Sequence, residues 1–221
     1  FLALKGDYVH SLDKYTAQQE DGVDQRSRYI RFQSTLSGYI PFVDKRNVLA
    51  LSATIGYIFH LEENSIAWAD RYFYLGGVST LRGFRSDTLR PEDIRPRYEP
   101  TDESGVPGKL VQELGGEAMF LLRSELRHDF GKNIVGVMFG EAGNLWRNTD
   151  SFLVNSWVES ARFRLRPTVG AGLHYNTPVG PLAFDVGINL NRNRHLREDS
   201  SSSSKLAEEL WAWYFSIGSA F

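Results

Sequence analysis

One arginine and two glutamates are the residues of this chain that could form a buried ionic site. Arg82 stands in the glycine-rich stretch YFYLGGVSTLRGF, at residues 72–84. Glu125 lies on the polar side of an alternating segment, and Glu141 begins the sequence EAGNLW. A guanidinium that is shielded from water binds carboxylates strongly and can do so in bidentate geometry. We therefore predict that Arg82 pairs with one or both glutamates. The alternatives are an exposed loop arginine and glutamates that only solvate a polar surface.

None of the patterns that indicate catalysis is found in the sequence. It has no cysteine, no nucleophile elbow and no phosphate-binding loop. Its five histidines show no spacing typical of metal ligands. The formal net charge of −2 gives no reason to expect a nucleic-acid partner. We therefore expect no enzymatic activity, no cofactor and no metal. The histidines are His10, His60, His128, His174 and His195.

Apolar and polar residues alternate with period two along most of the chain, which predicts about eight strands. The segments are about 9–15 residues long, whereas ordinary strands average about 5–6. A tilted strand that crosses a bilayer needs about 9–11 residues, so the lengths favour a membrane barrel over a soluble sandwich. A large lipocalin-like barrel is the alternative. The alternating segments cover residues 2–8, 29–40, 49–60, 117–127, 133–146, 161–177, 182–191 and 211–221.

The connections between these segments alternate between long and short. Outer-membrane barrels have long extracellular loops and short periplasmic turns, so this alternation predicts an all-β, antiparallel transmembrane barrel. The longest connection, residues 62–114, carries Arg82 and is too long for an idle hairpin loop. The other long connections are 13–27, 147–160 and 193–208, and the short ones are 42–46, 129–132 and 178–180.

The stretch around Arg82 resembles the loop that enters the lumen of barrels of the BamA/TamA superfamily. Those barrels insert and translocate outer-membrane proteins. The resemblance implies that the loop of this chain folds back into a barrel lumen and that Glu125 and Glu141 bind its arginine there. Aspartate is usual in the family at the second of these positions, so Glu141 is a departure. The residues that match the loop motif are Gly76, Gly77, Arg82, Gly83 and Phe84.

Two further stretches resemble the same superfamily. The sequence TPVGPLAFD, at residues 177–185, is similar to the tight turn of its penultimate hairpin. The last segment resembles the β-signal by which barrels are recognised for assembly. In the family this last strand borders a lateral seam through which client strands enter, and a glycine at position 218 would weaken the closure of that seam. The residues that match the signal are Phe215, Ile217, Gly218 and Phe221.

The resemblance covers the second half of a family barrel, which has about sixteen strands in full members. We therefore expect residues 1–221 to be the C-terminal part of an outer-membrane barrel domain. The implied function is assembly of outer-membrane proteins through a lateral seam. The implied partners are the outer-membrane bilayer, unfolded client proteins, and periplasmic or lipoprotein subunits. The alternatives are a polypeptide secretion pore and a small structural barrel of the OmpA type. The small barrel predicts a closed eight-strand ring with residues 62–114 outside it.

Overall fold

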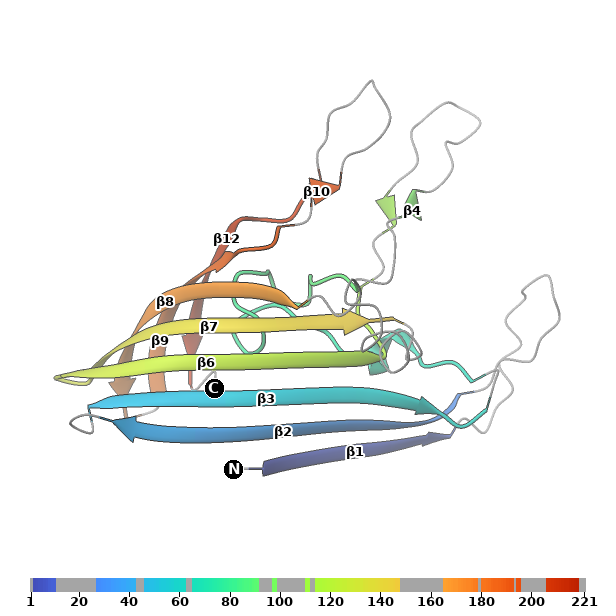
Figure 1. The fold of residues 1–221 in the computed structure, drawn as a ribbon, viewed down its shortest axis with the longest axis horizontal. Coiled ribbons are helices and arrows are strands. Elements are labelled where there is room, and N and C mark those ends of the chain that lie inside the picture. The colour runs from blue at the N-terminus through green and yellow to red at the C-terminus, as the bar shows by residue number, and fades with distance from the viewer. Residues whose placement is uncertain are drawn as a thin grey trace, which may run out of the picture.

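Eight long antiparallel strands form one curved sheet in a computed structural model of the chain (Figure 1). Their order along the sheet is β1-β2-β3-β6-β7-β8-β9-β12, so neighbours in the sheet are neighbours in the sequence of long strands. The structure describes residues 2–10, 27–42, 46–62, 65–91, 97–98, 110–111, 114–147, 165–178, 180–192, 194–195 and 206–218. The strands are β1 (Leu2–His10), β2 (Arg28–Phe42), β3 (Asn47–His60), β6 (Ala118–Gly131), β7 (Ile134–Trp146), β8 (Arg166–Thr177), β9 (Gly180–Asn189) and β12 (Trp211–Ile217). The predicted antiparallel all-β fold is confirmed.

The short connection between β6 and β7 is a tight turn with left-handed backbone angles. Between β6 and β7, Gly131, Lys132 and Asn133 have φ values of 81°, 53° and 66°. The Asp129 carboxylate accepts a hydrogen bond from the Gly131 N–H at 2.7 Å, which holds the start of this turn. Turns of this kind match the twist of the strands and fix their register.

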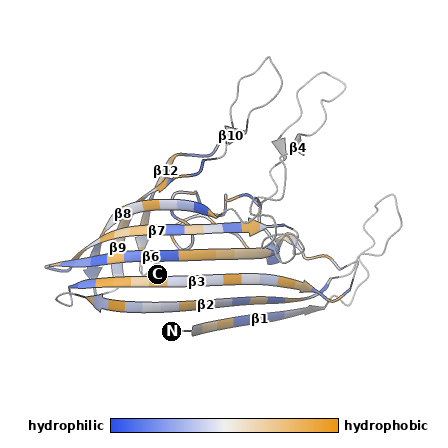
Figure 2. Cartoon of the chain, in the orientation of Figure 1, coloured by the Kyte–Doolittle hydropathy of each residue, from blue (hydrophilic) through white to orange (hydrophobic). Residues whose placement is uncertain are grey.

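Each strand has an apolar outer side and a more polar inner side because successive side chains point to opposite faces of a sheet. Figure 2 shows the resulting mixture of hydrophobic and hydrophilic residues along the strands. Leu36, Leu173 and Trp213 are 60%, 61% and 61% exposed on the outer side. An outward apolar face of this extent is typical of strands that contact lipid.

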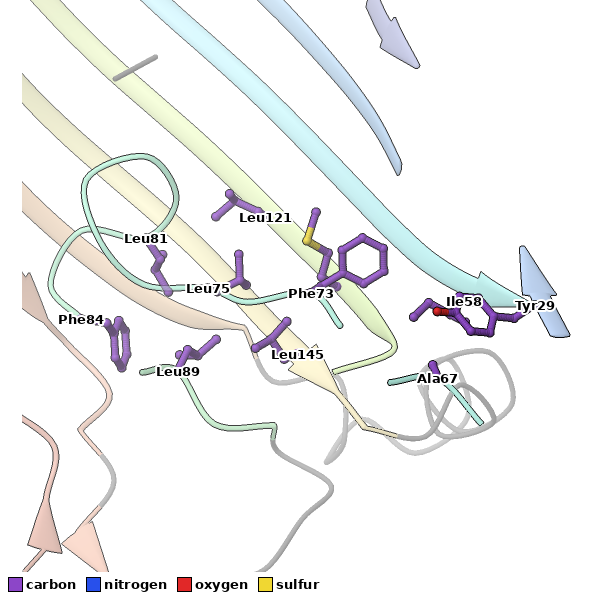
Figure 3. Close-up of a cluster of buried hydrophobic side chains, with 11 residues drawn as sticks. Tyr29, Ile58, Ala67, Phe73, Leu75, Leu81, Phe84, Leu89, Leu121 and Leu145 are labelled. Atoms are coloured by element: carbon purple, nitrogen blue, oxygen red, sulfur yellow. The ribbon is translucent and has the colours of Figure 1, made fainter. Parts of the chain in front are cut away.

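The long connection between β3 and β6 packs against the inner side of the sheet. It contains a short 3-10 helix, η1 (Ala69–Arg71), and a hairpin of β4 (Arg97–Tyr98) and β5 (Leu110–Val111). Loop side chains such as Leu75, Leu81 and Leu89 meet side chains of β6 and β7 in one buried hydrophobic cluster (Figure 3). The cluster consists of Tyr29, Ile58, Ala67, Phe73, Leu75, Leu81, Phe84, Leu89, Met119, Leu121 and Leu145.

The two ends of the sheet are open among the described residues. There β1 pairs with β2 alone, and β12 pairs with β9 alone. A second small hairpin, β10 (Arg194–His195) with β11 (Leu206–Ala207), lies in the connection that leads to β12. No helix of the described chain is long and apolar enough to cross a membrane.

The two faces of β2 should respond differently to a charge. Leu36→Arg places a guanidinium at the centre of the outer side and should destabilise the folded protein in lipid by about 2–4 kcal/mol. Gln33→Arg, on the inner side of the same strand, should cost less than about 1 kcal/mol because water can reach it. Urea unfolding in liposomes, followed by tryptophan fluorescence, measures both. Equal costs would contradict the assignment of the faces.

Candidate functional site

The loop tip that carries Arg82 is folded tightly on itself. Gly76 and Gly77 have φ values of 121° and 95°, which favour glycine. The Gly77 N–H donates to the Phe84 carbonyl at 2.9 Å, and the Thr80 hydroxyl donates to the Gly76 carbonyl at 2.8 Å. A Cβ atom on Gly76 would collide with the carbonyl oxygen of Arg85. The two glycines therefore allow the chain to turn back within the space that the curved sheet leaves.

The backbone of the loop tip lies against the inner side of the sheet, here called the wall. Two further glycines permit this contact, one in the loop and one on the wall. Gly83 has a φ of 107°, and a Cβ built on it would lie 3.0 Å from Cγ2 of Thr168 on β8. On β9, a Cβ built on Gly187 would lie 2.5 Å from the backbone nitrogen of Gly83. A side chain at Gly187 would therefore push the loop away from the wall.

Arg82 is 1% exposed and its guanidinium contacts three carboxylates. Its Nε and Nη2 donate to Oε1 of Glu141 at 2.9 and 2.7 Å, and its backbone N–H donates to Oε2 of the same residue at 2.6 Å. Nη2 also donates to Glu125 at 2.7 Å, and Nη1 donates to Asp185 at 3.2 Å. The guanidinium carbon lies 3.5 Å from the centre of the Phe139 ring. The arginine therefore joins the loop to β6, β7 and β9.

Each of the three carboxylates has a second basic neighbour on the wall. These neighbours keep the site from carrying a large negative charge when Arg82 is in place. They are Arg123, whose Nε donates to Glu141 at 3.2 Å, Arg127, whose Nε donates to Glu125 at 2.6 Å, and His174, whose Nε2 lies 3.0 Å from Asp185.

The charge of Arg82 is set by two opposing effects. Burial lowers the pKa of the guanidinium, but the carboxylates of Glu141 and Glu125 raise it, and the net shift is upward. The arginine is therefore charged at any physiological pH, and its contacts with the carboxylates are ionic.

Phe84 follows the arginine and is 4% exposed. The Arg166 guanidinium lies 4.9 Å from the centre of its ring. Arg166 in turn donates to the Glu208 carboxylate and, at 2.8 Å, to the Asn191 carbonyl. Phe84 thus extends the contact of the loop to the start of β8 and to the chain just before β12.

The structure brings the loop motif into contact with its two predicted partners, since Arg82 binds both Glu125 and Glu141. Among the polar contacts of the loop tip, sequence reasoning missed those of Asp185, Tyr214 and Arg123, whose Nη1 donates to the Ser79 carbonyl at 3.2 Å. Asp185 lies on the polar side of its alternating segment and ends the 177–185 stretch, so this position could have indicated it as a third partner of Arg82. Tyr214 lies among the aromatic residues of the last strand, and nothing in the sequence distinguishes it from its neighbours.

The residues of the predicted C-terminal signal lie apart from the arginine. Phe215 and Ile217 are 61% and 68% exposed on the outer side of β12. Gly218 follows the strand with a φ of 100°, and its N–H still donates to the Pro181 carbonyl at 2.8 Å. Phe221 lies outside the described residues.

Comparison with known proteins identifies the family. A family model described as the Omp85 superfamily domain matches residues 6–221. The chain belongs to the Omp85 superfamily. Its BamA/TamA-type resemblance, predicted from the loop motif and the last hairpin, is confirmed. Members are outer-membrane β-barrel proteins, so the predicted barrel class and outer-membrane location are confirmed as well.

Relatives of this Omp85 chain include two proteins named outer membrane protein assembly factor BamA. The protein of Neorickettsia risticii (strain Illinois) is 27% identical over 169 residues, which are 75% of this chain and 20% of the relative. The protein of Nitratidesulfovibrio vulgaris (strain Hildenborough) is 27% identical over 122 residues, or 55% of this chain and 13% of the relative. The chain therefore spans a fifth or less of the length of these relatives.

A solved structure shows the same fold. It is the crystal structure of BamA from Haemophilus ducreyi lacking POTRA domains 1-3, with a TM-score of 0.57 and 21% sequence identity. The match covers 84% of this chain and 34% of that one. The curved sheet of the Omp85 chain is therefore similar to part of a larger barrel.

Removal of the arginine should destabilise the loop and the wall together. Arg82→Ala leaves three buried carboxylates without their shared cation, which should cost about 3–5 kcal/mol of unfolding free energy. The matched control is Arg85→Ala, because the Arg85 side chain is 71% exposed and its ion pair with Glu209 should contribute less than about 1 kcal/mol. Denaturant unfolding in detergent micelles measures both. A cost for Arg82→Ala as small as that of the control would contradict the buried ionic site.

Proposed function

We propose that residues 1–221 are the C-terminal part of the barrel domain of an outer-membrane protein assembly factor. The observation that carries this proposal is the buried contact of Arg82, which anchors the loop to the inner side of β6, β7 and β9. Membership of the Omp85 superfamily and the similarity to proteins named BamA support it.

The proposed mechanism uses the edge of the sheet as a template. An edge strand presents a row of unpaired N–H and C=O groups, and an extended segment of another chain can pair with them. In this mechanism the client strand pairs with the edge of β12 that faces away from β9. The ionic contact of Arg82 meanwhile holds β6, β7 and β9 in place as a stable platform behind that edge.

The partners follow from this mechanism. The apolar outer side contacts the outer-membrane bilayer, and unfolded outer-membrane proteins pair with the edge of β12. Periplasmic or lipoprotein subunits would act with the complete protein. Strand templating requires no enzymatic step, no cofactor and no nucleic acid, because the client gains main-chain hydrogen bonds as it pairs.

A polypeptide secretion pore is the second candidate. It is favoured by the inner side of β2 and β3, whose hydroxyl groups suit a water-filled passage. There the hydroxyl oxygens of Thr35 and Thr54 lie 3.0 Å apart, and the Ser37 hydroxyl donates to the Ser52 hydroxyl at 3.2 Å. A small OmpA-type barrel has less support, since its closed eight-strand ring with the loop outside differs from the open sheet and the inner loop described above.

A photoreactive residue at three positions separates these functions. A probe at Phe215, on the edge strand, should cross-link to an unfolded client barrel during assembly. Probes at Leu36 and Gln33, on the outer and inner sides of β2, should give little product. Strong cross-linking at Gln33 instead would favour the secretion pore, because the polypeptide would then pass along the inner wall. Absence of client cross-links at all three positions would contradict both functions and favour the small structural barrel.

A further inference from the structure

We propose that the hydroxyl of Tyr214 is a latch that couples the position of the lumen loop to the position of the edge strand β12. Tyr214 lies on the inner side of β12, opposite Asp185 of β9 in the ladder. Asp185 binds the side chain of Arg82, and Tyr214 binds the backbone at the two residues that follow it. Adjacent positions of two neighbouring strands therefore hold the same loop tip.

The Tyr214 hydroxyl is used as both donor and acceptor. It accepts a hydrogen bond from the Gly83 N–H at 2.8 Å and donates one to the Phe84 carbonyl at 2.6 Å. A hydroxyl group can make both bonds at once, whereas phenylalanine can make neither. Loss of the hydroxyl would take the partner from the Gly83 N–H, which is costly for a partly buried group. It would also remove one of the two hydrogen bonds to the Phe84 carbonyl, which still accepts from the Gly77 N–H.

The second described polar contact between the loop tip and this part of the chain is weaker. Arg85 pairs with Glu209, which precedes β12, but these side chains are 71% and 49% exposed. A cavity of about 760 Å³ opens beside the pair, so water screens the charges. The cavity is lined by Arg85, Ser86, Arg192, Glu209, Trp211 and Tyr214, among others.

The position of β12 makes this latch consequential. The seven residues of β12 pair with β9 on one side, and no described strand pairs with the other. The loop, by contrast, is fixed to β6, β7 and β9 through Arg82. Through Tyr214 the fixed loop therefore restrains β12 as well. Movement of the loop tip must therefore loosen β12, and movement of β12 must loosen the loop tip, because coupling between two sites is reciprocal.

Hydrogen–deuterium exchange of the complete protein in lipid nanodiscs tests the latch. Tyr214→Phe should raise the exchange rate of the β12 amides about tenfold, the effect expected for loss of about one to two hydrogen bonds. Exchange in β2 and β3 should not change, which controls for folding. Ser216→Ala is the matched control, since this hydroxyl on the same side of β12 is buried without a hydrogen-bond partner among the described residues. It should leave exchange in β12 unchanged.

A second variant tests the coupling itself. Arg82→Lys should loosen the loop, because lysine cannot reproduce the bidentate contacts, and should thereby raise exchange in β12. In a Tyr214→Phe background the same substitution should add little to exchange in β12, since the hydrogen bonds of the loop tip to β12 are already lost and the exposed Arg85–Glu209 pair is a weak connection. Additive effects, or a Tyr214→Phe rate equal to that of Ser216→Ala, would overturn the proposal.

The consequence for client strands rests on the proposed assembly function, but the exchange experiment does not. If Tyr214→Phe loosens β12 but does not change the rate of client assembly, the latch proposal stands and templating at the edge of β12 is contradicted. An unchanged β12 would refute the latch whatever the assembly rate. The two failures are therefore distinguishable.

Discussion

A buried guanidinium is the constraint on which the rest of this structure depends. A charge that is 1% exposed must have partners of opposite charge, and Arg82 finds them on three strands. Those carboxylates point inward in the observed register, in which Glu125 lies opposite Phe139 and Gly172 lies opposite Asp185. A slip of one residue would turn a carboxylate toward the lipid side. The loop and the register of the wall therefore specify each other.

The hydrophobic core of the described protein lies between a loop and a sheet. The outer side of the sheet is apolar and exposed, and the bilayer can cover it. The inner side of β6 and β7 contributes Met119, Leu121 and Leu145, which pack against loop side chains. The long loop thus performs the packing role that a second layer of secondary structure has in a soluble domain. This role explains the length of the loop, since a connection that only joined β3 to β6 could be much shorter.

Support is distributed unevenly across the sheet. Each of β6, β7 and β9 has a ladder on both sides and a contact with the arginine, whereas β12 has one described ladder and the contacts at Tyr214 and Glu209. In the function that we propose, these supports hold β6, β7 and β9 in place while another strand pairs with the edge of β12. The close approach of Gly187 to Gly83 lets the loop lie near enough to reach both regions.

The sequence by itself determined the strands, their antiparallel order and the motif that enters the lumen. Period-two alternation is a local property, and the residues of the loop motif are contiguous, so both can be read without a structure. Glu125 and Glu141 could be proposed because they have the inward parity of their strands. The third carboxylate, Asp185, had the same parity, but 103 positions separate it from Arg82 in the sequence. Only the curvature of the sheet brings such distant residues into contact. The bond from Tyr214 to the loop backbone was decided in the same way, because a backbone partner leaves no signal in residue type.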